Sequence, residues 1–276
     1  MKKWYAVIGD PIAQSMSPIM HDTWFRENGI DASYIPIHVE ANHLKDAVDS
    51  LKRLGCSGWN VTVPHKSAII PFLDQVDEEA RRMDAVNTVK VLDDGTLFGT
   101  NTDGRGFVRS LQEIGTTPED VGELLIIGAG GAAAGISYAL ESASFGPIAI
   151  TNRTIEKAKQ MSKGITGSYA IQVDDAQSEI SKFGLIVQTT SVGMNFAQSG
   201  FPLDPKGISE GATVADIIYN PLETEFLCRA REAGGKTLNG IGMFVHQGAL
   251  AFELWTGVYP DTKKMIHSIT TELGGK

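Results

Sequence analysis

The sequence predicts an α/β protein of two domains, and three observations lead to this prediction. Strand-like runs rich in Val, Ile and Tyr alternate with segments of helical period, which is typical of domains built on parallel sheets. The glycine-rich stretch GAGGAA, residues 128–133, lies between a buried strand and a long helix. The chain has 276 residues, which is about the length of two domains.

The N-terminal part of the chain shows three strands separated by two helices. The first helix spans residues 17–29, with Ser17 as its expected N-cap, Pro18 at the first helical position and Gly29 as its stop. The second helix, residues 42–55, repeats apolar residues at helical period and also ends at a glycine. The strands are WYAVIG (4–9), YIPIHV (34–39) and WNVTV (59–63), and a hairpin of residues 85–92 and 96–101 follows around Asp93-Asp94-Gly95.

A second unit begins near Gly106, where FVRSLQEIG reads as a short helix. The run ELLIIGAGGAAAGISYALESA then combines a buried strand, a glycine turn and a long helix, and IAITNRT adds a second strand to complete a βαβ unit. Further strands are expected at 185–190, 213–219 and 237–238, and further helices at 224–235, 243–257 and 262–273. The alternation predicts parallel sheets in both units.

Composition limits the partners that the chain can take. The formal net charge of -9 disfavours nucleic acid and anionic membranes, although a local basic pocket could bind a phosphate. The two cysteines, Cys56 and Cys228, fit no metal or redox spacing, which indicates free thiols in a reducing compartment such as the cytoplasm. The first residues do not resemble a signal peptide, and no apolar run reaches the roughly 18 residues of a membrane span. We expect no metal, because the histidines lack metal-ligand spacing.

The glycine turn is suited to hold a pyrophosphate. Its residues are small enough for the backbone to approach a phosphate closely, and the helix that follows offers unbonded N–H groups and a partial positive charge. The glycine pattern alone is weakly specific, so the same glycines could instead do no more than form a tight turn. The candidate cofactor residues here are Gly128, Ala129, Gly130, Gly131 and Ala132.

The end of the next strand indicates which dinucleotide is favoured. A cofactor with a free 2′-hydroxyl usually requires Asp or Glu about 20 residues after the glycines. Asn152, Arg153 and Thr154 occupy that place, and Lys157 lies one helical step later. Two cations would attract a 2′-phosphate, so the sequence favours NADP over NAD, although in isolation both residues could be simple surface charges.

Several polar residues of the first unit lie at strand ends, where ligands of open α/β sheets gather. Taken singly, each residue has a simpler explanation. Ser17 could be no more than a helix cap, and Asn87 and Asp103 no more than turn caps. Lys66 could be an ordinary surface lysine. As a group, they suit a polyhydroxylated ligand that carries a carboxylate. The group comprises Ser15, Ser17, Asn60, Thr62, Lys66, Asn87 and Asp103.

Lys66 and Asp103 could form an acid–base pair for hydride chemistry. Hydride transfer to a ketone leaves an oxyanion that must be protonated, and in reverse the alcohol must lose a proton as the hydride departs. A lysine near a carboxylate can stabilise the oxygen electrostatically and transfer the proton. The sequence leaves open whether Lys66 alone or the pair moves that proton.

The motifs that carry these residues resemble those of the shikimate dehydrogenase family, NADP-dependent enzymes that reduce 3-dehydroshikimate to shikimate. Any one motif is modest evidence, but their order along almost the whole chain is highly specific. The motifs are GDPIAQSMSP (9–18), NVTVPHK (60–66), DAVNT (84–88), GTNTDGRGF (99–107), GAGGAA (128–133), NRT (152–154), TTSVGM (189–194), YNPLETEFL (219–227) and GIGMFVHQGALAFELWTG (240–257).

The resemblance implies a role for each matching position. Ser15 and Ser17 would bind the substrate carboxylate, with Tyr219 near it, and Asn60, Thr62, Asn87 and Gln247 would bind the ring hydroxyls. Lys66 and Asp103 would be the catalytic pair. Asn152, Arg153, Thr154 and Lys157 would grip the adenosine 2′-phosphate, and Thr189 and Met243 would lie against the nicotinamide side.

The resemblance also implies an architecture and a place in metabolism. Residues 1–105 and 239–276 would form the substrate-binding catalytic domain, residues 106–238 a Rossmann-type NADP-binding domain, and the active site would be the groove between them. The enzyme would act on a small molecule in aromatic amino-acid biosynthesis, the chorismate pathway, as a monomer or homodimer.

Two alternatives remain open. One is a quinate/shikimate dehydrogenase with relaxed specificity, although such enzymes usually carry threonine or glycine near the second serine and often an acidic residue in place of Arg153. Ser17 and Arg153 argue against it. The other is an NADP-binding sensor without turnover, against which the presence of both Lys66 and Asp103 argues.

Overall fold

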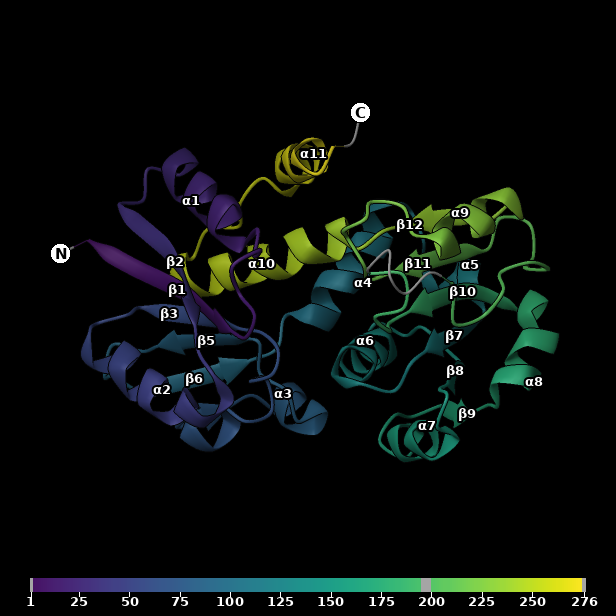
Figure 1. Cartoon of the computed structure of the whole chain (residues 1–276), viewed down its shortest axis with the longest axis horizontal. Coiled ribbons are helices and arrows are strands. Elements are labelled where there is room, and N and C mark those ends of the chain that lie inside the picture. The colour runs from purple at the N-terminus through teal and green to yellow at the C-terminus, as the bar shows by residue number, and fades with distance from the viewer. Residues whose placement is uncertain (1, 195–199, 275–276) are drawn as a thin grey trace. The chain divides into compact units, whose positions relative to one another are not determined.

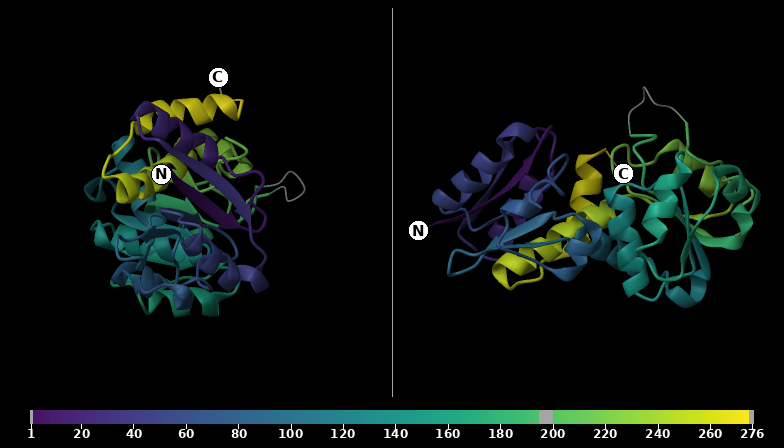
Figure 2. Two further views of the ribbon diagram at one scale, coloured as in Figure 1. Left: turned by 90° about the vertical axis from the view of Figure 1, so that its left-hand side faces the viewer. Right: turned by 90° about the horizontal axis from the view of Figure 1, so that it is seen from below.

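The structure is a computed structural model that describes residues 2–194 and 200–274, and its chain divides into two compact units. Unit 1 comprises Met1–Thr102 and Gln247–Met265, and unit 2 comprises Asp103–His246 and Ile266–Lys276. Each unit contains one six-stranded sheet with helices packed on it (Figure 1, Figure 2). None of the helices within the described ranges has the length and apolar character that crossing a membrane requires.

Unit 1 holds the first eleven elements of the chain. They are β1 (Lys3–Gly9), α1 (Ser17–Glu27), β2 (Ala32–His38), η1 (Ala41–His43), α2 (Leu44–Arg53), β3 (Gly58–Val61), η2 (Ile70–Phe72), β4 (Gln75–Val76), α3 (Glu78–Met83), β5 (Thr88–Val91) and β6 (Leu97–Thr100). The predicted strands, helices and hairpin of this part are confirmed. β4 and α3 were not predicted, because both are very short.

The sheet of unit 1 has the strand order β2-β1-β3-β5-β6-β4. The first three strands are parallel. β5 and β6 form the predicted hairpin, in which β5 is antiparallel to β3 and β6 is antiparallel to β5. The expectation of a parallel sheet is therefore wrong for this unit, because a short hairpin can only return the chain antiparallel.

The two faces of the unit 1 sheet are packed differently. Alternate residues of β1 point to opposite faces, so Ala6 and Ile8 join the aliphatic core beneath α2, while Tyr5 points to an aromatic cluster. β2, α1 and the end of helix α10 (Ile241–Thr256) supply the rest of that aromatic cluster, which contains Tyr5, His21, Trp24, Phe25, Tyr34, Phe252 and Trp255. This cluster fixes α1 against β1 and β2.

Unit 2 begins with helix α4 and is built on a fully parallel sheet. Its elements are α4 (Asp103–Glu113), α5 (Pro118–Val121), β7 (Glu123–Ile127), α6 (Gly131–Ser142), β8 (Ile148–Thr151), α7 (Ile155–Ser162), β9 (Ser168–Ala170), α8 (Val173–Ser178), η3 (Ile180–Lys182), β10 (Phe183–Gln188), β11 (Thr213–Asp216), α9 (Glu225–Glu232) and β12 (Lys236–Leu238). Helices α10 and α11 (Thr262–Glu272) close the chain.

The strand order of unit 2 identifies its fold. Read from one edge, the order is β9-β8-β7-β10-β11-β12, and each adjacent pair is parallel. Numbered by their sequence within the unit, the strands run 3-2-1-4-5-6, which is the order of the doubly wound dinucleotide-binding fold. The predicted parallel sheet and the Rossmann-type unit are confirmed.

The observed units and the predicted domains have different boundaries. Residues 103–105 open α4, and Gly104 lies so close to α6 that a Cβ there would come within 2.2 Å of the Gly135 carbonyl oxygen. Residues 239–246 also group with unit 2, where Gly240 packs against Ile217 and Gly242 against Ser110. Helix α10 thus starts in unit 2 and ends in unit 1.

His21 makes the stability of unit 1 depend on pH. Its ring is fully buried among aromatic side chains with no hydrogen-bond partner at either nitrogen, and burial lowers its pKa from 6.5 to about 3. The unfolded chain therefore binds a proton below about pH 6.5 that the folded chain excludes, so the free energy of unfolding falls as the pH drops.

We expect this loss to reach about 2 kcal/mol at pH 5 relative to pH 7.5, and His21→Phe to remove it. Urea unfolding of both proteins at the two pH values measures the difference, with His267→Phe at an exposed site as the control. An equal pH dependence in wild type and His21→Phe would contradict the assignment.

Candidate functional site

The predicted site residues are distributed over both units. Unit 1 holds Ser15, Ser17, Asn60, Thr62, Lys66, Asn87 and Gln247. Unit 2 holds Asp103, Tyr219 and all the predicted cofactor residues. The arrangement is therefore described within each unit.

A buried hydrogen-bond network joins three of the predicted substrate residues in unit 1. The Asn60 amide nitrogen donates to the Thr88 hydroxyl at 3.0 Å and to the Asn87 backbone carbonyl at 3.2 Å. The Thr88 hydroxyl donates to Asn87 Oδ1 at 2.8 Å, and Asn87 Nδ2 donates to Gln247 Oε1 at 3.5 Å. The structure thus brings together Asn60 from β3, Asn87 from the turn before β5 and Gln247 from α10.

The two serines lie where β1 leads into α1. The Ser17 backbone N–H donates to the Ser15 hydroxyl at 3.3 Å. Ser17 is not the N-cap: the helix begins at Ser17, and Met16 takes the N-cap position without a side-chain hydrogen bond. The Ser17 side chain is buried.

Lys66 sits on a turn that is fixed by backbone and histidine hydrogen bonds. After β3, the His65 N–H donates to the Thr62 carbonyl at 2.9 Å, and the Lys66 carbonyl accepts from the Val86 N–H at 2.8 Å. The His65 ring is fully buried, with Nε2 at 2.6 Å from the Val39 carbonyl oxygen. Lys66 itself is half-buried, so its backbone is held while part of its side chain meets solvent.

Asp103 is joined to the network through its chain neighbour Thr102, and Thr62 lies at the end of a strand. Asp103 follows Thr102, whose backbone N–H donates to Asn87 Oδ1 at 2.9 Å, so the Asp103 backbone starts one residue from the network. The Thr62 N–H donates to the Ile8 carbonyl at 3.0 Å, which places Thr62 at the end of the central parallel strands.

The glycine turn of unit 2 lies at the point where the strand order reverses. Gly128 follows β7 with φ +120°, and a Cβ there would come within 2.5 Å of the Thr189 hydroxyl, so only glycine fits. Thr189 follows the neighbouring strand β10 and bonds the Ile127 carbonyl at 2.8 Å through its hydroxyl. In open α/β sheets, ligands bind outside the strand ends at this switch point.

The start of α6 has room for a phosphate. A Cβ built on Gly130 or Gly131 meets no atom within 4 Å, so the space at this helix N-terminus is open. Ala129 and Ala132 are half-buried beside it. Open space, small residues and a helix N-terminus fit a pyrophosphate.

The predicted 2′-phosphate residues lie between β8 and α7. The Asn152 side chain donates to the Thr154 carbonyl at 2.9 Å and shapes the turn. Arg153, Thr154 and Lys157 are exposed, so both cations are accessible to an anion from solvent.

Two buried polar side chains shape the loops after β10 and β11. Gln188 donates to the carbonyls of Thr190 and Val192, both at 3.1 Å, and accepts from the Thr190 N–H. Asp216 accepts from the Ile218 N–H at 3.0 Å and the Thr224 hydroxyl at 2.8 Å, and burial raises its pKa to about 6 against these two hydrogen bonds.

The other two predicted residues of unit 2 are near these loops in the chain. Tyr219 stacks on Phe244 of α10 with ring centroids 5.0 Å apart, and burial raises the pKa of its hydroxyl. Met243 precedes Phe244 and is half-buried.

Sequence reasoning missed the residues that hold the site residues in place. Tyr34 donates to Asn60 Oδ1 at 2.6 Å, Thr88 bridges the two asparagines, and Gln188 orders the loop that begins with Thr189. The only signal for Thr88 and Gln188 was a polar residue at an otherwise apolar strand position. Tyr34 gave no signal, because tyrosine is common in strands.

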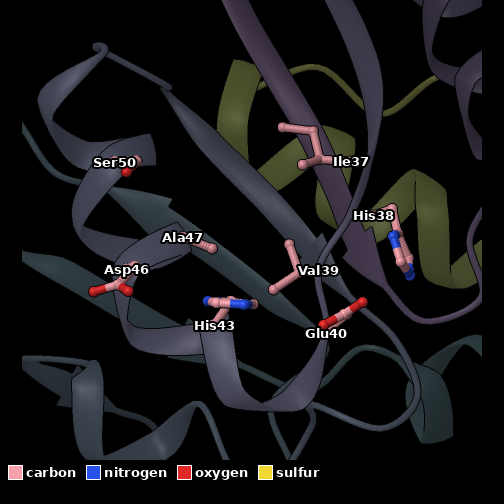
Figure 3. A pocket seen from close by; sticks show the side chains of 8 residues that line it. All are labelled: Ile37, His38, Val39, Glu40, His43, Asp46, Ala47 and Ser50. Carbon is pink, nitrogen blue, oxygen red and sulfur yellow. The ribbon is translucent and has the colours of Figure 1, made fainter.

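A surface hollow elsewhere in unit 1 contains none of the predicted residues (Figure 3). Its lining comes from the end of β2, from η1 and from α2, and is mostly exposed: Ile37, His38, Val39, Glu40, His43, Asp46, Ala47 and Ser50. Across residues 2–194 and 200–274, no three His, Cys, Asp or Glu side chains are grouped so as to hold a metal ion.

Comparison with known proteins matches three family descriptions along the chain. Residues 7–89 match the shikimate dehydrogenase substrate binding domain, residues 116–198 match shikimate/quinate 5-dehydrogenase, and residues 240–269 match the shikimate 5′-dehydrogenase C-terminal domain.

Individual relatives are similar over their full length. A shikimate dehydrogenase (NADP(+)) of Lysinibacillus sphaericus is 49% identical over 276 residues, 100% of both chains. The crystal structure of Thermus thermophilus shikimate 5-dehydrogenase with NADP(H) and shikimate superposes with a TM-score of 0.88 at 35% identity, covering 98% of this chain and 99% of that one. A quinate dehydrogenase of Corynebacterium glutamicum with NAD gives 0.90 at 29% identity, covering 98% and 99%. The chain belongs to the shikimate dehydrogenase family.

Proposed function

We propose that this protein is an NADP-dependent shikimate dehydrogenase, which reversibly reduces 3-dehydroshikimate to shikimate in aromatic amino-acid biosynthesis. The observation that carries this proposal is the buried network of Asn60, Thr88, Asn87 and Gln247 in unit 1. It offers convergent amide and hydroxyl groups, which suit a small polyhydroxylated ring. The family relationship and the dinucleotide-binding topology of unit 2 support the same reaction.

Each polar group has a place in substrate binding. Ser15 and Ser17 bind the substrate carboxylate, and Tyr219 lies near it. Asn60, Thr62, Asn87 and Gln247 bind the ring hydroxyls. The support is the hydrogen bonds that Ser15, Asn60, Asn87 and Gln247 make, because side chains held before binding lose little entropy when the ligand arrives.

Lys66 and Asp103 are the proposed catalytic pair. The bound cofactor supplies or accepts the hydride. The Lys66 ammonium stabilises the charge that develops on the substrate oxygen and donates the proton that converts it to a hydroxyl, with Asp103 as its partner carboxylate. The fixed Lys66 turn supports this role, because a held backbone limits the positions that the ammonium can take.

The cofactor residues follow the topology of unit 2. Gly128, Ala129, Gly130, Gly131 and Ala132 hold the pyrophosphate at the start of α6. Thr189 and Met243 lie on the nicotinamide side. Asn152, Arg153, Thr154 and Lys157 bind the 2′-phosphate, and the exposure of both cations supports this assignment.

The same proposal includes the setting of the enzyme. Both cysteines are free thiols, which suits the reducing cytoplasm. A monomer or a homodimer remains the expected assembly.

A spectrophotometric assay tests the function. NADPH absorbance is followed on mixing the protein with shikimate or quinate and with NADP or NAD. We expect kcat/KM to be highest for shikimate with NADP. A preference for quinate with NAD would instead identify a quinate dehydrogenase, and binding of both ligands without turnover would identify a sensor.

Lys66→Ala tests the proton transfer. We expect kcat to fall about 10²-fold or more, because acid–base help is lost, while the Kd for shikimate changes little. Steady-state kinetics and calorimetry measure the two effects. Lys45→Ala, at an exposed lysine of α2, is the matched control and should retain full activity. Near-normal turnover in Lys66→Ala would exclude Lys66 from the chemistry.

Arg153→Asp tests the phosphate contact. The new carboxylate would repel the 2′-phosphate, so we expect KM to rise at least about tenfold for NADP and much less for NAD. Lys163→Asp makes the same change of charge at the far end of α7 and should alter neither value. Equal losses for both cofactors would remove the proposed contact.

A further inference from the structure

Tyr34 is a buried hydroxyl that no step of the proposed reaction uses. It lies on β2, is 3% exposed, and its ring stacks on His21 with centroids 4.3 Å apart. Its backbone N–H donates to Asp22 of α1 at 2.9 Å. The ring and backbone of Tyr34 are thus fixed in place by α1.

The direction of the hydrogen bond between Tyr34 and Asn60 follows from the backbone. The Asn87 carbonyl can only accept, so the atom of Asn60 at 3.2 Å from it is the amide nitrogen. The other side-chain atom of Asn60 is therefore the oxygen, which can only accept. Tyr34, at 2.6 Å from that oxygen, must donate its one proton to it.

The same logic orients the next residue of the network. The Thr102 N–H can only donate, so the atom of Asn87 at 2.9 Å from it is Oδ1. The Thr88 hydroxyl accepts from Asn60 and donates to Asn87 Oδ1. Hydrogen bonds therefore run in one direction, from Tyr34 through Asn60 and Thr88 to Asn87.

We infer that Tyr34 is a positioning residue for the substrate: its hydroxyl donates to Asn60 Oδ1 and fixes which atoms of the Asn60 amide face the ligand. This inference rests on the proposed function, in which Asn60 binds a ring hydroxyl. Without the Tyr34 hydroxyl, the Asn60 side chain loses a partner and gains other rotamers. Binding shikimate must then order it again, which weakens binding but leaves the hydride and proton transfers unchanged.

Tyr34→Phe tests the inference, with Tyr5→Phe as the matched control. Tyr5 is the direct neighbour of Tyr34 across the β1–β2 pair and belongs to the same aromatic cluster, but it has no proposed role in the site. We expect Tyr34→Phe to raise the Kd and KM for shikimate about tenfold, with kcat and the KM for NADP within about twofold of wild type. Tyr5→Phe should leave all four constants within about twofold.

Calorimetry with shikimate alone measures the Kd without any turnover, so the test does not depend on the activity. If the wild-type protein binds shikimate but does not turn it over, the proposed function is overturned. The effect of Tyr34→Phe on the Kd for shikimate can still be measured in that case. An unchanged Kd in Tyr34→Phe, or an equal rise in Tyr5→Phe, would overturn the positioning role.

A double-mutant cycle gives an independent test. If Tyr34 acts through Asn60, Tyr34→Phe should weaken shikimate binding less in an Asn60→Ala background than in wild type. Effects that simply multiply would overturn the inference. Asn60→Ser, which keeps a small polar side chain, serves as the background if Asn60→Ala fails to fold.

Discussion

The backbone carbonyl of Asn87 is the group on which the order of the unit 1 site depends. It can only accept, and it therefore fixes which end of the buried Asn60 amide is the donor. The opposite orientation would place the Asn60 oxygen against the Asn87 carbonyl oxygen, acceptor against acceptor, at a cost of about 1–3 kcal/mol for each unsatisfied group. One backbone atom thereby determines the direction of several side-chain hydrogen bonds, and the site is ordered before any ligand arrives.

Unit 2 achieves order by a steric constraint at its switch point. Gly128 and the Thr189 hydroxyl lie so close together that a side chain at residue 128 would separate the ends of β7 and β10. The adjacent Gly130 and Gly131 have no such neighbour, and their missing side chains leave open space instead. Glycines of one short motif therefore serve two purposes, close packing in the first case and room for a ligand in the others.

Much of this organisation could be predicted from the sequence. Hydrophobic periodicity gave the long helices and the buried strands, and the glycine turn after LLII gave the dinucleotide-binding unit. The short elements β4 and α3 could not be predicted, because two to six residues carry too little periodicity. The predicted N-cap of Ser17 was wrong by one position, because the helix begins at Ser17 itself and capping rules do not define a helix boundary to the residue. Tyr34 itself could not be recognised, since its role depends on a neighbour 26 residues away.

Helix α10 carries both a proposed cofactor residue and a proposed substrate residue. Met243 and Gln247 are four residues apart in an unbroken helix, so they lie on one face, separated by about 6 Å along the axis. Adding or deleting one residue between them would turn them by about 100° relative to each other, so they would no longer share that face. The number of residues between Met243 and Gln247 is therefore more strictly constrained than the identity of most of those residues.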